Sequence, residues 1–119
     1  MGKRRGASRE VSTLVRQAVE AILNRLAEKP RLIVLFGSEA RGDATPESDV
    51  DILVVADRAD RDVRQQVLDA TYQVMWNRDF DRLISVVVMP TSEFEEQKRK
   101  GFSFVRNVER EGIVLWPAA

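Results

Sequence analysis

The sequence contains no cysteine and no histidine. Without cysteine there is no disulfide framework and no thiolate metal site. Without histidine, the Ser-His-Asp triad, imidazole general bases and His-ligated zinc are all excluded. Any metal that the chain binds must therefore be held by oxygen ligands, which favours magnesium or manganese.

Charge of one sign and long apolar runs are also lacking. The 19 Lys and Arg residues balance 19 Asp and Glu residues, so the formal net charge is zero. This balance argues against broad, charge-driven binding to nucleic acid, which requires a basic surface. The longest apolar run is too short to span a bilayer. The basic segment 1–10 is not followed by the apolar region of a signal peptide. We therefore expect a cytoplasmic protein that has no membrane contact.

What is present is the pattern of one small domain of the α/β (α+β) class. The 119 residues suit a single domain over 1–119, with residues 1–7 as a flexible basic N-terminus. The expected helices are 8–29, 60–77, one that a capping box opens at Ser92, and 102–111 closed by a Gly112 cap; the expected strands are 32–36, 50–55, 83–89 and an extended 113–116. This order predicts a small mixed β-sheet with helices packed on it. The large aromatic residues, Trp76 and Phe102 among them, are expected mainly in the core, with some available to a partner.

Two acidic residues stand at the head of the second apolar strand. Asp49 and Asp51 share one face of that strand, about 7 Å apart along the backbone, while Val50 and Ile52 point into the core. Two carboxylates at one site repel each other unless a cation lies between them. Divalent metals held in this way suit phosphoryl and nucleotidyl transfer. A turn would explain Asp49, but it would not explain Asp51 within the apolar run.

The loop before the acids carries groups that suit phosphate. Gly37 allows a ligand close to the backbone, and Ser38 offers a hydroxyl and an amide at the start of an expected helical turn. Arg41 adds a planar cationic fork that suits phosphate. A surface salt bridge is an equally good explanation of Arg41. A triphosphate on Gly37-Ser38, with metals on Asp49 and Asp51, accounts for all of these residues together.

Gly37-Ser38, ten further residues and then Asp49-Val50-Asp51 resemble the signature of polymerase-β-like nucleotidyltransferases. The longer string GSEARGDATPESDVDILV is similar to their minimal, single-domain branch, the MNT proteins. This resemblance implies a polymerase-β-like palm. It implies that Gly37 and Ser38 bind nucleotide phosphates with Arg41 nearby. It also implies that Asp49 and Asp51 hold Mg²⁺ or Mn²⁺ and carry the catalysis.

One feature departs from the family pattern. Active members of the family usually carry a third acid on the next strand, and the predicted strand 83–89 has none. Ser85 and Val87 are the residues expected nearest that position. Asp81 has the same face parity but lies about 13 Å from Ser85 along an extended strand, so only a bulge would bring it into the site. Glu39 and Asp43 match no catalytic position.

Two functions follow from the resemblance. The first is an enzyme that transfers a nucleoside monophosphate, expected to be AMP from ATP, to a hydroxyl of a partner protein. The minimal branch is typically paired with a HEPN-domain protein, so the chain would be the antitoxin of a HEPN/MNT pair and would form a hetero-oligomer. The second is a catalytically weak or inactive binding module that neutralises or scaffolds the same partner. The absent third acid favours the module, and the intact Asp49-Asp51 pair favours the enzyme.

Overall fold

The computed structural model describes residues 9–117, with side chains from residue 11 onward. The elements in chain order are α1 (Arg9–Arg25), β1 (Leu32–Phe36), α2 (Ser38–Arg41), β2 (Val50–Ala56), α3 (Arg61–Asn77), β3 (Ile84–Pro90), α4 (Thr91–Lys100), α5 (Ser103–Glu111) and β4 (Ile113–Trp116). The expected mixed sheet with packed helices is confirmed. The predictions for residues 1–8 lie outside the described residues.

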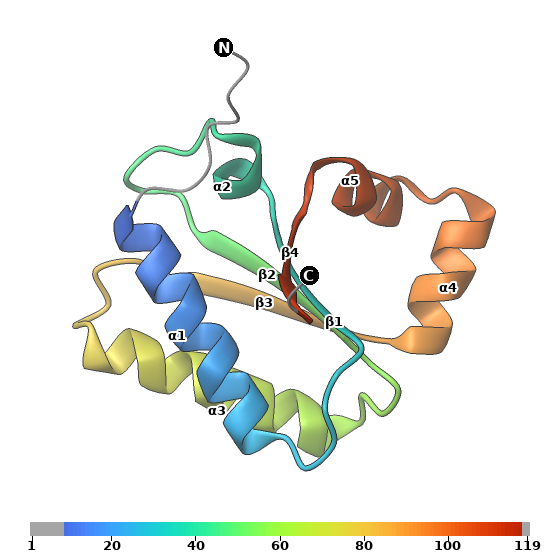
Figure 1. Cartoon of the computed structure of the whole chain (residues 1–119), viewed down its shortest axis with the longest axis horizontal. Helices are drawn as coiled ribbons and strands as arrows, with labels where there is room; N and C mark the ends of the chain where they lie inside the picture. Colours follow the sequence, from blue (N-terminus) through green and yellow to red (C-terminus); the bar gives the residue numbers. More distant parts are fainter. Residues whose placement is uncertain (1–8, 118–119) are drawn as a thin grey trace.

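The four strands form one sheet in the order β3-β2-β1-β4. β1 is antiparallel to β2 and to β4, whereas β2 and β3 are parallel and are joined through α3. Helices α1 and α3 cover one face of the sheet, and α4 and α5 lie on the other (Figure 1). The central strands β1 and β2 are thus covered on both faces, which explains their continuous apolar sequence. Helix α2 stands apart, at the end of β1 and beside the start of β2 (Figure 1).

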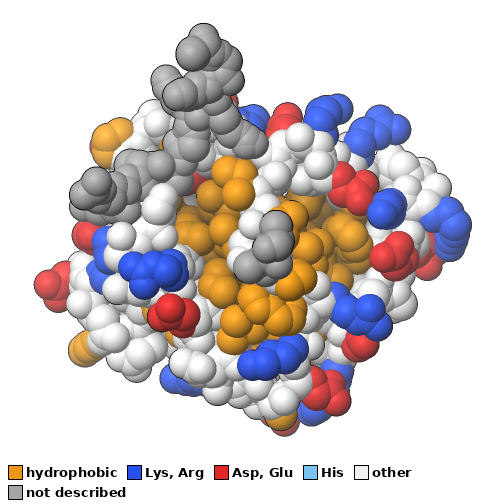
Figure 2. Space-filling view, viewed as in Figure 1, with side chains coloured by type: hydrophobic (Ala, Val, Ile, Leu, Met, Phe, Trp, Pro, Cys, Tyr) orange, Lys and Arg blue, Asp and Glu red, His pale blue; other side chains and the backbone are white. Residues whose placement is uncertain are grey.

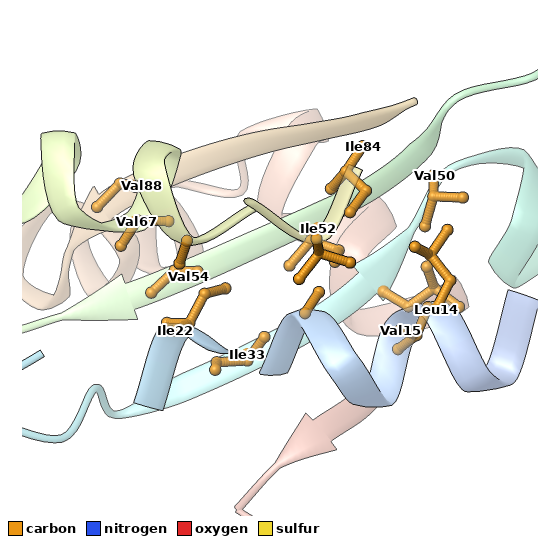
Figure 3. Packing of buried hydrophobic residues seen from close by; sticks show 14 of the residues in the cluster. Leu14, Val15, Ile22, Ile33, Val50, Ile52, Val54, Val67, Ile84 and Val88 are labelled. Atoms are coloured by element: carbon orange, nitrogen blue, oxygen red, sulfur yellow. The ribbon is translucent and has the colours of Figure 1, made fainter. Parts of the chain in front are cut away.

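The larger part of the core lies between the sheet and α1 and α3 (Figure 3). Its fully buried side chains include Leu14, Ile22, Ile33, Ile52 and Val67. A smaller cluster on the opposite face joins Val34, Leu53 and Val55 to α4 and α5. Val50 and Ile52 are buried in the larger cluster, as predicted. Because side chains alternate along a strand, Asp51 faces the α4 and α5 side of the sheet.

Two helix ends differ from the sequence prediction. Helix α1 ends at Arg25 rather than at Lys29, because the chain turns to enter β1 and Pro30 disfavours a helical residue before it. The prediction that a capping box at Ser92 opens the next helix is wrong. Helix α4 begins at Thr91, with extended Pro90 as the N-cap and no side-chain cap hydrogen bond. Strand β3 therefore passes directly into α4, and Ser92 lies inside its first turn.

Gly112 follows α5 as predicted, but for a different reason from the left-handed cap that glycine commonly provides. Its backbone is extended, with φ −73° and ψ 158°. A Cβ at this position would collide with the carbonyl oxygen of Val108 and with Cγ1 of Val34. Close packing of the end of α5 on β1 is what requires a glycine here.

The prediction that Trp76 and Phe102 lie in the core is wrong, since they are 60% and 50% exposed. The inner face of α3 is already filled by Val67 and Val74, and Trp76 falls on the opposite side of the helix. The ring centroid of Trp76 lies 6.1 Å from that of Phe80, within an exposed aromatic cluster.

A second apolar region surrounds β4. Figure 2 shows hydrophobic side chains gathered over β4 and toward α1, with charged side chains around them. A groove of about 240 Å³ between α1 and β4 is lined mainly by Val15, Val19, Leu35, Ile113 and Leu115. In residues 9–117, no helix is both long enough and apolar enough to cross a membrane.

We expect Gly112→Ala to lower the free energy of unfolding by about 1–3 kcal/mol, the usual cost of overpacking. The added methyl group must displace backbone as well as the Val34 side chain. Urea denaturation followed by circular dichroism measures the change. An unaltered midpoint would show that close packing is not the reason for glycine at this position.

Candidate active site

The predicted phosphate loop and acid pair are adjacent in the structure. The β1–β2 register pairs Phe36 with Asp51, so the chain leaves β1 at Gly37 directly beside Asp51. Gly37 has a φ of 77°, in the left-handed region that favours glycine. A Cβ at this position would also collide with the carboxylate of Asp51. Glycine is thus needed both for the turn and for the close approach of the loop to the acid.

The electrostatic environment of Asp51 includes the neighbouring acid Asp49. Asp51 is partly buried at the second position of β2, and Asp49 is exposed just before the strand. Burial raises the pKa of Asp51 above its ordinary value, the negative charge of Asp49 raises it further, and Arg41 lowers it. The pair therefore carries a repulsion that Arg41 opposes, and a cation placed between the two carboxylates would relieve it.

Arg41 lies at the end of α2 with its side chain partly exposed. Its Nε donates to Asp43 Oδ2 at 3.2 Å, and its Nη1 lies 3.8 Å from Glu111 Oε1. Exposed ion pairs of this kind are weak. The salt-bridge explanation of Arg41 and its proximity to the acid pair both hold, so its cationic fork is close to the site and only loosely engaged.

Ser38 begins the predicted helical turn, which the structure confirms as α2. The first helical hydrogen bond of this turn runs from the Arg41 amide to the Gly37 carbonyl at 3.1 Å. The amides of residues 38–40 precede that bond, and such N–H groups have no acceptor within a helix. The Ser38 carbonyl accepts from the Gly42 and Asp43 amides, which closes the turn and fixes the loop over Asp51.

Glu39 belongs to the site region although the sequence assigned it no role. Its side chain is 9% exposed, and its Oε2 lies 2.5 Å from Nη2 of Arg82. The same Nη2 donates to the carbonyl oxygen of Ser48 at 2.7 Å. Helix α2 is too short for a periodicity signal, and Arg82 is 43 residues away in the chain. No local pattern could have revealed this contact.

The sheet register shows which of Ser85 and Val87, the two residues expected nearest the position of a third acid, lies beside the acid pair. The parallel pairing of β2 with β3 places Ser85 beside Asp51 and Val87 beside Leu53. Ser85 is therefore the residue adjacent to the acid pair, and it is exposed. Asp81 lies before β3, where it pairs with Arg78 across 3.5 Å. The β2–β3 register runs without a shift, so no bulge carries Asp81 inward.

The protein itself offers two carboxylates for a metal. Among the side chains that the structure describes, no group of three or more His, Cys, Asp or Glu residues could hold a metal ion. Mg²⁺ is commonly bound by one or two carboxylates together with substrate phosphates and water. The Asp49-Asp51 pair fits that arrangement, in which the nucleotide supplies the remaining oxygen ligands.

The sequence model of a family described as "Nucleotidyltransferase domain" matches residues 15–115. The chain belongs to the nucleotidyltransferase family. Two proteins of Methanocaldococcus jannaschii, each named "putative protein adenylyltransferase", are similar to it. One is 38% identical over 86% of this chain and 94% of its own length, and the other is 29% identical over 87% and 97%. The predicted family and the prediction that the chain is an enzyme, a nucleotidyltransferase, are confirmed.

Solved structures of nucleotidyltransferases share the fold. The crystal structure of a "putative nucleotidyltransferase" from Sulfolobus solfataricus has a TM-score of 0.53 and 21% identity, covering 98% of this chain and 91% of that chain. A chain in the crystal structure of a toxin–antitoxin with AMP-PNP has a TM-score of 0.53 and 24% identity, covering 87% and 73%. At these identities the likeness concerns the fold alone, and it confirms the predicted architecture.

We expect Asp51→Asn to raise the thermal midpoint of the metal-free nucleotidyltransferase at neutral pH. The folded-state pKa of Asp51 lies above its ordinary value of 3.8, so ionisation of this carboxyl costs stability in the folded state. The cost is complete above the folded pKa and disappears as the pH falls below 3.8. The advantage of the variant should disappear over the same range.

Thermal scans from pH 3 to pH 8 measure this difference. Glu47→Gln, which removes an exposed acid of the same loop, is the control and should leave the midpoint nearly unchanged. An Asp51→Asn variant less stable than the parent at neutral pH would contradict the repulsion.

Proposed function

We propose that this nucleotidyltransferase transfers AMP from ATP to a hydroxyl of a partner protein, with Asp49 and Asp51 as the catalytic metal ligands. The observation that carries the proposal is the contact between Gly37 and Asp51. At the end of β1 and the start of β2, a backbone that suits phosphate lies beside carboxylates that suit a cation. A metal-bound triphosphate needs both kinds of group together.

Each residue of the site has a task in this reaction. The backbone at Gly37 and Ser38 holds the phosphates, and Arg41 balances their negative charge. Asp49 and Asp51 hold Mg²⁺ or Mn²⁺ jointly with phosphate oxygens. The metal, when bound, stabilises the charge that develops as the α-phosphate is transferred and pyrophosphate leaves. The repulsion between the two acids in the metal-free state makes their site selective for a cation.

The choice of AMP and of a protein acceptor is supported by the relatives from Methanocaldococcus jannaschii, whose name describes protein adenylyltransferases. The similar fold in a toxin–antitoxin bound to AMP-PNP supports a partner protein. The resemblance to the minimal branch supports a HEPN-domain protein as that partner, in a cytoplasmic hetero-oligomer in which this chain is the antitoxin.

One observation favours a second function, a binding module that neutralises the partner by contact with little or no transfer. Ser85 occupies the position beside Asp51 where the third acid is expected. A serine hydroxyl neither holds a metal as a carboxylate does nor takes a proton readily from the attacking hydroxyl. The two functions share the fold and the partner, and they differ in whether AMP becomes covalently attached.

Incubation with labelled ATP, Mg²⁺ and the product of the neighbouring gene tests the proposal. We expect label on the partner, and we expect Asp51→Asn to reduce the rate at least about 100-fold, as for loss of a group central to the chemistry. Glu47→Gln is the matched control in the same loop. Tight binding of the partner without any label, with either metal, would favour the binding module.

We expect Ser85→Asp to accelerate transfer about ten-fold or more, the low end of the gain from a positioned base. Val87→Asp places the same acid beside Leu53 instead of Asp51 and should give no acceleration. Single-turnover rates separate this effect from nucleotide binding. A parent that already transfers rapidly, with no gain in Ser85→Asp, would show that another acid completes the site.

A further inference from the structure

The pair of Glu39 and Arg82 has an environment that differs from that of the other charges. Glu39 is the one acidic or basic residue that is buried among the side chains described. The Arg82 side chain is 16% exposed, and its Nε is buried with no hydrogen-bond partner. The remaining ion pairs between described side chains are more exposed on at least one side.

Arg82 connects the two halves of the site. Through Glu39 it holds α2, the helix that follows Gly37. Through the Ser48 carbonyl it holds the residue directly before Asp49. The residue after Arg82 is also fixed there, because the Leu83 carbonyl accepts the Val50 amide at 2.8 Å. A single guanidinium thus ties the phosphate loop to the start of β2.

Stability alone is a poor explanation for this arrangement. Burying a carboxylate and a guanidinium costs desolvation that their attraction often fails to repay, and an apolar pair of similar volume is frequently as stable. The unpartnered Nε of Arg82 adds to that cost. An apolar pair makes no directional contacts. A planar guanidinium, in contrast, holds its two hydrogen-bond acceptors at fixed angles.

We infer that Arg82 is a positioning residue, which holds α2 and its backbone amides in a fixed place relative to the acid pair through its bonds to Glu39 and to the Ser48 carbonyl. This inference rests on the proposed function, because it takes Gly37 and Asp51 as the two ends of one metal–nucleotide site. Arg82 acts through the loop and the strand rather than on the substrate. Its contribution is to let one nucleotide engage the amides and the metal at the same time.

The measurable consequence is the coupling between metal and nucleotide. If the metal-binding and phosphate-binding groups are held at the correct distance, Mn²⁺ and ATP bind cooperatively. Each of the two then raises the affinity for the other by the same factor. A change in the relative position of these groups should weaken the cooperativity between Mn²⁺ and ATP, even in a protein that remains folded. Misplacement of reacting groups by 1 Å can also cost about 100-fold in rate, so transfer should fall as well.

The test uses the double variant Glu39→Leu/Arg82→Met, which removes both charges together. Single removal would leave a buried charge without its partner and could unfold the chain. We expect the double variant to keep the circular dichroism spectrum and thermal midpoint of the parent, or to exceed that midpoint. ATP affinity is measured by calorimetry in EDTA and in Mn²⁺, and the ratio of the two affinities should fall about ten-fold, within the usual range of coupling.

Two further variants define the cause. Arg82→Lys keeps the charge and has N–H donors for both acceptors, but its flexible ammonium lacks the fixed directions of the planar guanidinium, so its coupling should lie between the parent and the double variant. Arg64→Met is the matched control, because Arg64 Nη1 donates to the Val88 carbonyl at 2.7 Å near the far end of β3. It should leave the coupling intact.

A folded double variant with the coupling and the transfer rate of the parent would overturn the inference and leave the proposed function standing. A parent that binds no Mn²⁺–ATP would overturn both. Loss of coupling in Arg64→Met as large as that in the double variant would also overturn the inference, since the effect would then not be specific to Arg82.

Discussion

The close approach of the Gly37 backbone to the Asp51 carboxylate depends on one constraint, the register of β1 against β2. That register is specified by burial. Val50 and Ile52 must face α1 and α3, and a slip of one residue would exchange the two faces of the strand. Asp51 would then enter the larger core as an unpaired charge. The packing that stabilises the sheet therefore also places the acid beside the loop, and the site follows from the same alternation that builds the core.

The electrostatics of the site oppose the stability of the metal-free fold. Burial and the charge of Asp49 both raise the pKa of Asp51, and Arg41 offsets them only in part. A protein selected for stability alone would have neutral residues there, as the general conflict between stability and activity leads one to expect. The same repulsion makes the pair receptive to a divalent cation. In the proposed function, Arg41 and the α2 amides balance the charge of the phosphates that accompany such a cation, so the cost would be recovered when both ligands are bound.

The parts of this arrangement that could be predicted are those encoded locally. β1, β2 and the turn at Ser38 follow from apolar runs bounded by turn residues, and the acid pair is visible because Asp51 interrupts such a run. The family signature lies within residues 37–51. Contacts set by tertiary structure could not be predicted. The β2–β3 register is needed to distinguish Ser85 from Val87, and Glu39 meets Arg82 at a sequence separation of 43. The burial of Trp76 was predicted wrongly because the apolar arc of α3 is wider than the face that the sheet can cover.

The side from which an acceptor would attack follows from the positions of the phosphate loop and the acid pair on the sheet. In the proposed reaction pyrophosphate leaves on the side of Gly37 and α2, and displacement at phosphorus requires the attacking oxygen to approach from the opposite side. That side is β3, where Ser85 and Val87 share the face of Asp51 and are exposed. A short side chain at Ser85 leaves room there for an acceptor while it withholds the carboxylate that would activate the attacking hydroxyl. In the proposed function, Ser85 would thus both slow transfer by this chain alone and leave the site open to a partner protein.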